Sequence, residues 1–283
     1  AGVVLDADAL ADTDMHALAR ELGSADTAFV LQPDAADHDL RVRFLTPRGE
    51  AAFIGHATLA VHAVLAGLQE QPRPRQKHAG GIIQVDTIAG ASPPRIAIHQ
   101  PPPPPTQVPD ALRLAAVLEA LSLPPAQLDP RCPPAIAGAG GKRLLLAVSD
   151  ADVLAGLRVD LARLAGLPAQ IGAAGAFLFT LRPRLPDVYT EARMFCPALG
   201  IPEDPVSGNA HALLGAYLWQ CGLPQTPPQG GSDAGMLEFT GAQGQHMGRP
   251  GRVTVALGLQ AGALASVSIL GEAVIAFMAT LEF

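Results

Sequence analysis

The sequence predicts an α+β protein of two pseudo-symmetric domains, each with strands gathered around one central apolar helix. Two observations lead to this prediction. The segments Ala57–Leu68 and Ala210–Cys221 repeat apolar residues at helical spacing, and the second is apolar on its other faces too, as buried helices are. Between them stands the proline run Pro101–Pro105, which can be neither helix nor sheet interior. We therefore place a domain boundary at this run.

The boundary defines two predicted domains. The N-terminal domain covers residues 1–105 with its central helix at 56–68, and the C-terminal domain covers residues 106–283 with its central helix at 208–221. The last strand could pack back on the first domain. Other helices are expected after a cap at Asp12 or Thr13, and over Ala111–Leu121 and Asp150–Leu157. Alternating or β-branched segments predict strands at Val3–Leu5, Ala28–Leu31, Leu40–Phe44, Gly80–Thr87, Arg95–Gln100, Arg143–Val148, Gly175–Leu181, Val188–Phe195, Met236–Phe239, Arg252–Leu257, Ala265–Ile269 and Ala273–Met278.

Composition limits the classes of function. The 283 residues are 49% hydrophobic and 16% charged, which allows a sizeable core. A net charge of -7 without a basic cluster argues against nucleic acid or an anionic membrane as a partner. No apolar run reaches the roughly 20 residues that span a bilayer. Cys132, Cys196 and Cys221 form no metal or disulfide pattern. We expect a soluble, cytoplasmic protein.

The two halves of the chain resemble each other. Aligned on Gly55 and Gly208, the central helices place their apolar residues at the same spacing, and upstream Arg43–Pro47 parallels Arg193–Pro197. Each half then has a strand ending at a proline, a loop with an acid, a glycine followed by a polar residue, and the buried helix. This common order indicates duplication. Two related domains would bring two helix N-termini to one cleft, which suits a small carboxylate.

The helix N-termini are the places where we expect chemistry. The first backbone N–H groups of a helix have no intrahelical partner and attract anions. Asp204 stands beside the second N-terminus and could carry a proton, or could equally be a capping carboxylate. His56 follows Gly55 and is well placed to contact a ligand. His211 and His62 lie inside the helices, where packed and hydrogen-bonded histidines are expected.

Other chemistries lack their patterns. The histidines are not at HxxxH spacing and no cysteine pair assists them, so we expect no metal. The glycine clusters at Gly80–Gly81 and Gly138–Gly141 lack the strand-to-helix context of a dinucleotide fingerprint, so we expect no nucleotide cofactor. No Gly-x-Ser-x-Gly elbow is present. Asp26, between a helix stop and a strand, is by position alone a turn residue.

Longer motifs resemble a known family. Phe53–Ala60 and Glu203–Ala212 are similar to the two signature stretches of the phenazine-biosynthesis PhzF-like family. The stretch from Arg20 to Val30 resembles its first motif, and Gln243–Gly244 with Gly248–Pro250 resembles a later one. The motifs occur in the family's order and extend over nearly the whole chain.

The resemblance implies the diaminopimelate-epimerase-like fold, in which two similar domains each wrap a curved, mostly antiparallel sheet around a central helix. It also implies an isomerase that needs neither cofactor nor metal and that forms homodimers. In the best-understood member a glutamate moves a proton between ring carbons of a dihydro-hydroxyanthranilate. That glutamate falls on Asp26 here, and His56 and Asp204 match family residues at the site. Four further positions match the two helix entrances: Gly55, Gly208, Ser207 in place of a common threonine, and Asn209 in place of a serine.

Two departures from the family pattern matter, and one comparison within the fold excludes a different chemistry. Aspartate is one methylene shorter than glutamate, and proton transfer is sensitive to displacements of about 1 Å, so the family's substrate does not transfer to this chain. The chain also begins after the family's first strand, so a preceding segment is expected. Thiol-dependent racemases of the same fold place a cysteine in each half's motif, and neither motif has one here.

The sequence therefore predicts a cofactor-independent isomerase that acts on a small carboxylate-bearing metabolite by acid/base proton transfer between the two domains. The alternative is a non-catalytic small-molecule-binding or scaffold protein that retains the fold. Solvent deuterium exchange into candidate substrates distinguishes the two. The predicted catalytic residues are Asp26, His56 and Asp204, and the predicted substrate-binding residues are Gly55, Ser207, Gly208 and Asn209.

Overall fold

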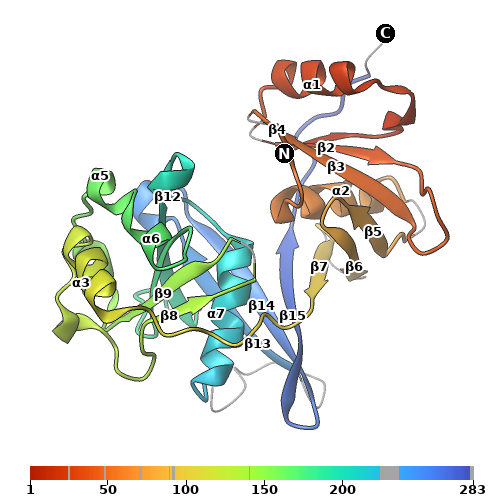
Figure 1. Ribbon diagram of the computed structural model, residues 1–283. Helices are drawn as coiled ribbons and strands as arrows, with labels where there is room; N and C mark the ends of the chain where they lie inside the picture. Colours follow the sequence, from red (N-terminus) through yellow and green to blue (C-terminus); the bar gives the residue numbers. More distant parts are fainter. Residues whose placement is uncertain are drawn as a thin grey trace. The chain divides into compact units, whose positions relative to one another are not determined.

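The computed structural model of the protein describes residues 1–24, 26–47, 49–69, 72–88, 90, 93–139, 141–223 and 236–280. The chain divides into two units (Figure 1). The first comprises Ala1–Gln100 and Leu270–Phe283, and the second comprises Pro101–Ile269. The division after Gln100 falls at the start of the proline run.

The first unit contains a mixed sheet in the order β1-β2-β3-β5-β6-β7, with β4 added to β3. The β1–β2 and β3–β5 pairs are parallel, and the β2–β3, β3–β4, β5–β6 and β6–β7 pairs are antiparallel. The strands are β1 (Gly2–Val4), β2 (Thr27–Leu31), β3 (Leu40–Thr46), β4 (Gly49–Ala51), β5 (Arg75–His78), β6 (Gly81–Ile88) and β7 (Arg95–Gln100). The helices are η1 (Ala7–Ala9), α1 (Asp12–Glu21) and α2 (Gly55–Gly67).

Helices α1 and α2 cover opposite faces of β2 and β3 (Figure 1). Successive side chains of a strand point to opposite faces. Accordingly, Ala28 and Val30 belong to the buried cluster that contains Val61 of α2, while Phe29 packs with Met15 of α1. All five residues of β2 are buried as a result. This explains why β2 reads as a continuous apolar run in the sequence.

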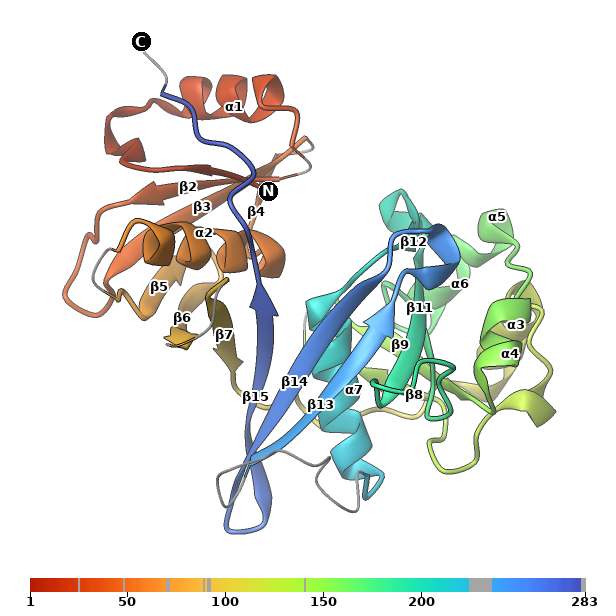
Figure 2. The same cartoon turned by 180° about the vertical axis from the view of Figure 1, so that it is seen from behind.

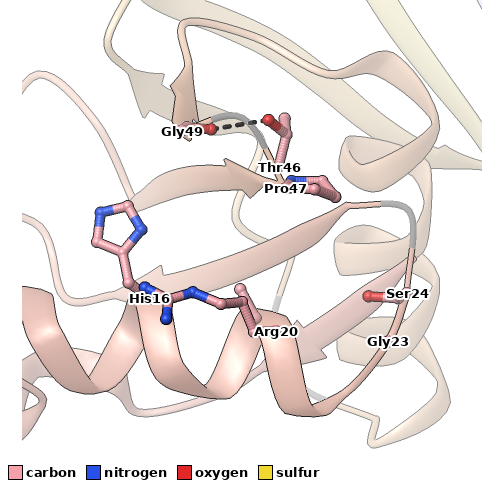
Figure 3. Close-up of a pocket in the computed structure, with 8 residues that line it drawn as sticks. His16, Arg20, Gly23, Ser24, Thr46, Pro47 and Gly49 are labelled. Atoms are coloured by element: carbon pink, nitrogen blue, oxygen red, sulfur yellow. Dashed lines mark hydrogen bonds between the residues drawn. The ribbon is translucent and has the colours of Figure 1, made fainter.

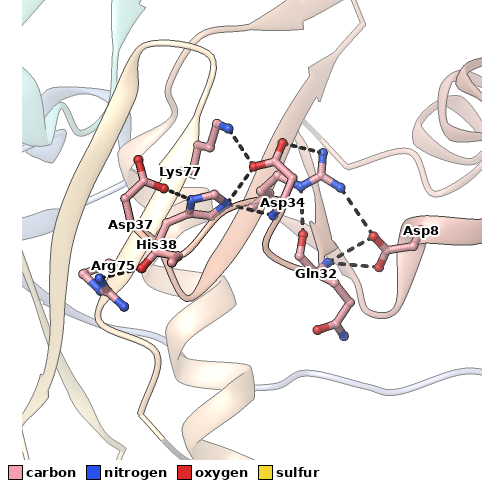
Figure 4. Close-up of polar contacts among 9 residues, drawn as sticks. Asp8, Gln32, Asp34, Asp37, His38, Arg75 and Lys77 are labelled. Atoms are coloured by element: carbon pink, nitrogen blue, oxygen red, sulfur yellow. Dashed lines mark hydrogen bonds and ion pairs between the residues drawn. The ribbon is translucent and has the colours of Figure 1, made fainter.

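A polar network closes the turn between β2 and β3 (Figure 4). His38 is buried there, with Nδ1 2.6 Å from Asp37 Oδ1, and its Nε2 accepts the backbone N–H of Asp34 at 3.2 Å. The same turn is tied to β5, because Lys77 donates to Asp34 and Arg75 donates to Asp39. These contacts hold the loop to the sheet.

The second unit has the strand order β15-β14-β13-β11-β10-β9-β8, with β12 added to β11. The β9–β10 and β11–β13 pairs are parallel, and the β8–β9, β10–β11, β11–β12 and β13–β14 pairs are antiparallel. The strands are β8 (Ala135–Ala137), β9 (Arg143–Val148), β10 (Gly175–Thr180), β11 (Thr190–Cys196), β12 (Ile201–Asp204), β13 (Met236–Gln243), β14 (Gly251–Gln260) and β15 (Ala263–Glu272). The helices are α3 (Ala111–Ala120), α4 (Ala151–Gly156), α5 (Leu161–Leu164), α6 (Leu167–Gln170) and α7 (Gly208–Gln220), with short turns η2 (Pro125–Gln127), η3 (Pro197–Leu199) and η4 (Gln245–Met247).

Helix α7 is the central element of the second unit. Every residue from Ala210 to Leu218 is buried, within a cluster drawn from β9, β10, β11, β13 and β14. At Gly215 a β-carbon would lie 2.7 Å from a methyl group of Val255, so the glycine allows α7 to approach β14 closely. The prediction of a helix that is buried all round is confirmed.

The predicted fold class is confirmed, since each unit is an α+β layer structure with a mainly antiparallel sheet and one central apolar helix. The predicted strand Ala273–Met278 is wrong: the chain leaves the sheet after Glu272, and within the described residues this segment has no strand partner for its N–H and C=O groups. It runs along the first unit instead (Figure 2), where Ala273 packs with Ala63 of α2. The sequence analysis also missed the short strands β4, β5, β8 and β12, and it expected loops where β4 and β12 lie.

Candidate functional site

An arginine–glutamate pair recurs at the same place in both units. In the first unit Arg43 of β3 donates from Nε and Nη2 to the two carboxylate oxygens of Glu50 in β4, at 2.9 and 2.7 Å. In the second unit Arg193 of β11 donates in the same way to Glu203 of β12, at 2.9 and 2.8 Å. We call these two ion pairs the strand clamps. Each ties a short added strand to the strand before it.

The strand clamps fix the segment that leads into each central helix. Glu50 precedes Gly55 by the same number of residues as Glu203 precedes Gly208. In both units the clamped strand therefore leads through a loop of equal length to the first residue of the helix. The clamps were not foreseen from the sequence, although Arg43 and Arg193 begin the two parallel stretches that indicated a repeat. They support the duplication with a shared contact rather than a shared pattern.

The N-terminus of α2 is not capped by a side chain. The residue before the helix is Ile54, whose side chain has no hydrogen-bonding atom, and Thr58 N–H is the first to bond back, to Ile54 O at 3.0 Å. Within the described residues, no hydrogen bond engages the N–H groups of Gly55, His56 and Ala57. Three backbone donors at one helix end form a site that favours a negative charge.

Asp26 and His56 meet beside this helix N-terminus. His56 Nε2 lies 2.9 Å from Asp26 Oδ2, within hydrogen-bond distance. The Asp26 side chain is 17% exposed and that of His56 is 60% exposed, so the pair is reachable from solvent. Asp26 is held by its backbone, since its carbonyl accepts from Gly2 N–H and from the Ser24 hydroxyl, both at 2.9 Å. Two of the three predicted catalytic residues are thus in contact.

The N-terminus of α7 is capped. The Ser207 hydroxyl accepts from Ala210 N–H at 3.3 Å, and the Ser207 carbonyl accepts from Nδ1–H of His211 at 2.9 Å. The hydroxyl and the carbonyl of Ser207 are therefore both engaged in hydrogen bonds with α7. Within the described part of the chain, the N–H groups of Gly208 and Asn209 make no hydrogen bond, and the Asn209 side chain is exposed and makes none either. These are the donors that α7 can offer to a ligand.

Asp204 ends β12, just before this helix. It is half-buried, and its Oδ1 accepts from Val206 N–H at 3.3 Å, which closes a tight turn toward Ser207. Asp204, Ser207, Gly208 and Asn209 lie in the second unit, and Asp26, Gly55 and His56 lie in the first. The structure thus gathers the predicted residues into two groups, one at each helix N-terminus.

Gln243 supports the second group, and the sequence analysis noted it only as part of a motif. Its side chain is buried at the end of β13, with Nε2 donating to Asp204 O at 2.6 Å and Oε1 accepting from Ser207 N–H at 3.2 Å. One amide therefore holds both ends of the loop from Asp204 to Ser207. At Gly244, φ is +89° and a β-carbon would lie 2.6 Å from the Pro205 carbonyl oxygen. These contacts explain why a glutamine followed by a glycine stands at this place in the chain.

The two helix histidines are packed groups, as predicted. His62 is buried and donates from Nε2 to the Gln76 side chain at 3.1 Å, and burial lowers its pKa to about 4. His211 is fully buried, and burial lowers its pKa to about 4 as well. Both histidines are therefore neutral at pH 7. Their desolvation outweighs the hydrogen bond that each ring makes.

The three cysteines form no disulfide, and no metal cluster accompanies them among the described residues. Cys132, Cys196 and Cys221 are free, and burial raises the pKa of Cys196. Among the residues that the structure describes, no group of three or more His, Cys, Asp or Glu side chains is arranged to hold a metal ion. In the same residues, no helix is both long enough and apolar enough to cross a membrane.

Comparison with known proteins agrees with this fold. The uncharacterized isomerase YddE of Salmonella typhimurium is 37% identical over 99% of this chain and 91% of its own length. An uncharacterized isomerase of Clostridium acetobutylicum is 32% identical over 99% of this chain and 92% of its own.

Solved structures show the same architecture. The phenazine biosynthesis protein of the PhzF family from Bacillus anthracis aligns with a TM-score of 0.78 at 24% identity, over 95% of this chain and 89% of that one. A predicted epimerase from Pseudomonas aeruginosa aligns with a TM-score of 0.71 at 28% identity, over 95% of this chain and 88% of that one. The sequence profile of the phenazine biosynthesis-like proteins matches residues 1–279. The chain therefore belongs to the phenazine biosynthesis-like protein family and, like these relatives, to the isomerases.

Proposed function

We propose that this isomerase moves a proton within a small carboxylate-bearing metabolite, using its own side chains and no cofactor. The observation that carries the proposal is the 2.9 Å contact between Asp26 and His56 beside the uncapped N-terminus of α2. It joins a proton-carrying acid, a polar partner and an anion-binding helix end in one place. The names of the relatives and the family resemblance support the reaction class.

Asp26 is the proposed base and acid. Its Oδ2 faces His56, whereas within the described residues no hydrogen bond engages Oδ1. Oδ1 would take a proton from a substrate carbon activated by a neighbouring unsaturated group and return it to another carbon. The double bond then shifts, and nothing is oxidised or reduced. His56 would keep the carboxylate aimed at the substrate by holding the other oxygen.

The two glycines at the helix entrances support a ligand-binding role. A β-carbon at Gly55 would meet its nearest neighbour at 3.9 Å, and one at Gly208 would meet its nearest at 3.5 Å, both ordinary contacts. Internal sterics therefore do not demand glycine at either position. Glycine does allow a ligand to approach a helix end closely. We infer that the free N–H groups there, together with the Asn209 amide, bind the substrate carboxylate, with Asp204 and the capping residue Ser207 shaping the second entrance.

Solvent deuterium incorporation tests the proposal. The wild-type protein is incubated in D2O with a panel of small unsaturated carboxylic acids, the family's dihydro-hydroxyanthranilate among them, and substrate protons are followed by NMR. We expect exchange or isomerisation of at least one compound, and its loss in Asp26→Asn. Asp152→Asn is the matched control, because that side chain is 85% exposed and lies in the second unit.

The outcome separates the enzyme from a binding protein that retains the fold. A compound that binds to the wild type without exchange above background would favour the binding protein. Turnover that persists in Asp26→Asn would move the base to another residue. From the family resemblance we also propose a cytoplasmic homodimer, whose stoichiometry sedimentation equilibrium measures.

A further inference from the structure

A pocket of about 440 Å³ lies in the first unit between α1 and the turn from β3 to β4 (Figure 3). Its volume is in the range of small-molecule sites, roughly 300–1,000 Å³. It is lined by His16, Ala19, Arg20, Gly23, Ser24, Thr46, Pro47 and Gly49. One wall is thus a helix with two basic side chains, and the opposite wall is a turn.

The pocket adjoins the candidate catalytic pair through Ser24 but is lined by other residues. Neither Asp26 nor His56 lines it. Helix α1, which supplies its basic wall, covers the sheet face of Phe29, whereas α2 covers the opposite face. The proton-transfer proposal leaves this pocket without a role.

The hydroxyl groups of the pocket already donate within the protein. Ser24 donates to the carbonyl of Asp26, and Thr46 donates to the carbonyl of Gly49, each at 2.9 Å. Arg20 and His16 differ from them. Within the described residues neither side chain makes a hydrogen bond or an ion pair, and both extend from the same side of α1 (Figure 3). They stand four residues apart, so they are neighbours on the helix surface.

Nearby carboxylates do not neutralise Arg20. Asp12 and Glu50, whose charges reach His16, are both bonded to Arg43, at 2.6 and 2.7 Å. Neither carboxylate lines the pocket. Among the described residues no carboxylate forms an ion pair with Arg20, so the pocket wall carries an unpaired guanidinium beside an imidazole that can donate as well.

We propose that this pocket binds a small anion through a carboxylate or phosphate group, with Arg20 as the principal ligand and His16 as a second donor. A planar guanidinium can donate two parallel hydrogen bonds to either group. The volume leaves room for a small metabolite attached to the anionic group. The inference does not rest on the proton-transfer proposal, since none of its residues belongs to that pair.

Isothermal titration calorimetry tests it on the full chain, with inorganic phosphate in one series and malonate in another at constant ionic strength. The variants are Arg20→Gln, His16→Gln and Arg158→Gln. Arg158 is the matched control, because it is an exposed arginine of the second unit whose side chain makes no hydrogen bond or ion pair with a described residue. Urea unfolding of each variant verifies that it is folded.

We expect the wild type to bind at least one of the two anions. Arg20→Gln should weaken binding at least tenfold, His16→Gln should weaken it several-fold, and Arg158→Gln should leave it unchanged. Preference for phosphate or for malonate identifies the anionic group that the pocket takes. No binding of either anion by the wild type, or equal binding by wild type and Arg20→Gln, would overturn the proposal. An equal loss in Arg158→Gln would overturn it too, because the effect would then be general electrostatics.

Discussion

Gln243→Glu should destabilise the second unit, because it converts one of two buried hydrogen bonds into a repulsion. The Gln243 side chain is 1% exposed, and its Nε2–H group donates to Asp204 O at 2.6 Å. The substitution keeps the oxygen that accepts from Ser207 N–H but places a second oxygen against the Asp204 carbonyl. A buried polar group left unsatisfied costs about 1–3 kcal/mol, and an added charge increases that cost. We expect a loss of about 3 kcal/mol at pH 7.

The loss should depend on pH in a direction that the geometry fixes. When the introduced carboxyl is protonated, its O–H can donate to the Asp204 carbonyl as the amide did. Burial and the facing carbonyl raise its folded-state pKa above the usual glutamate value of about 4.3. Below about 4.3 both folded and unfolded states carry the proton and the penalty is small; it grows as the pH rises from there toward the folded pKa.

Urea unfolding followed by Trp219 fluorescence measures this effect, because the single tryptophan lies on α7 and packs against the core of the second unit. The matched control is Gln260→Glu, the same change at an exposed strand end. The difference between the two variants should be about 3 kcal/mol at pH 7 and should shrink toward pH 4.5. Equal midpoints at pH 7, or a difference that grows on acidification, would refute the reasoning.

Three further expectations concern stability. His62 and His211 have pKa values of about 4 in the folded protein, so below about pH 6.5 protons bind preferentially to the unfolded chain. The free energy of unfolding should therefore fall by roughly 1.4 kcal/mol per histidine and pH unit between about pH 6.5 and pH 4. Urea titrations at several pH values should show this fall, with a shallower slope in His62→Gln. Gly215→Ala places a β-carbon 2.7 Å from Val255 and should cost about 1–3 kcal/mol by thermal unfolding, whereas Gly208→Ala meets nothing closer than 3.5 Å and should unfold like the wild type. Arg193→Gln leaves the Glu203 charge without its partner, the two side chains being 12% and 17% exposed, and should cost about 3 kcal/mol. The exposed pair Arg163–Glu119 provides its control, since Arg163→Gln should change stability by less than about 1 kcal/mol, and similar losses in both variants would contradict the burial argument.

The sequence predicts the long elements of this fold better than the short ones. Helix α7 and strands such as Arg143–Val148 are recovered because they are strongly apolar and nearly completely buried, and α2 is recovered from the helical spacing of its apolar residues. Strand β5 reads Arg75-Gln76-Lys77-His78, with only Gln76 buried, so its pairing with β6 has no apolar signal. The prediction for Ala273–Met278 is wrong for the opposite reason. The segment is apolar in sequence but is not a strand, and its Val274 is 76% exposed.

Some parts of the candidate site could likewise be predicted from the sequence, and others could not. Position along the chain was enough to mark the helix N-termini, because unsatisfied N–H groups follow from helix geometry alone. The contact between Asp26 and His56 joins residues distant in sequence, so only the resemblance to a family indicated that Asp26 is more than a turn residue. The strand clamps and Gln243 were missed because a buried ion pair or amide cannot be told from an exposed one without knowing the partners.

The strand clamps also show that two units with the same frame can carry different functional groups. Each unit has an arginine and a glutamate that hold its helix entrance in place. Around that common frame the corresponding positions differ: Ala51 stands where the second unit has Asp204, and His56 stands where it has Asn209. One entrance thus has a histidine whose acid, Asp26, comes from a distant part of the chain, and the other has an acid and an amide within its own segment. The two entrances therefore present different polar groups to a ligand, although the ion pair that holds each entrance is the same.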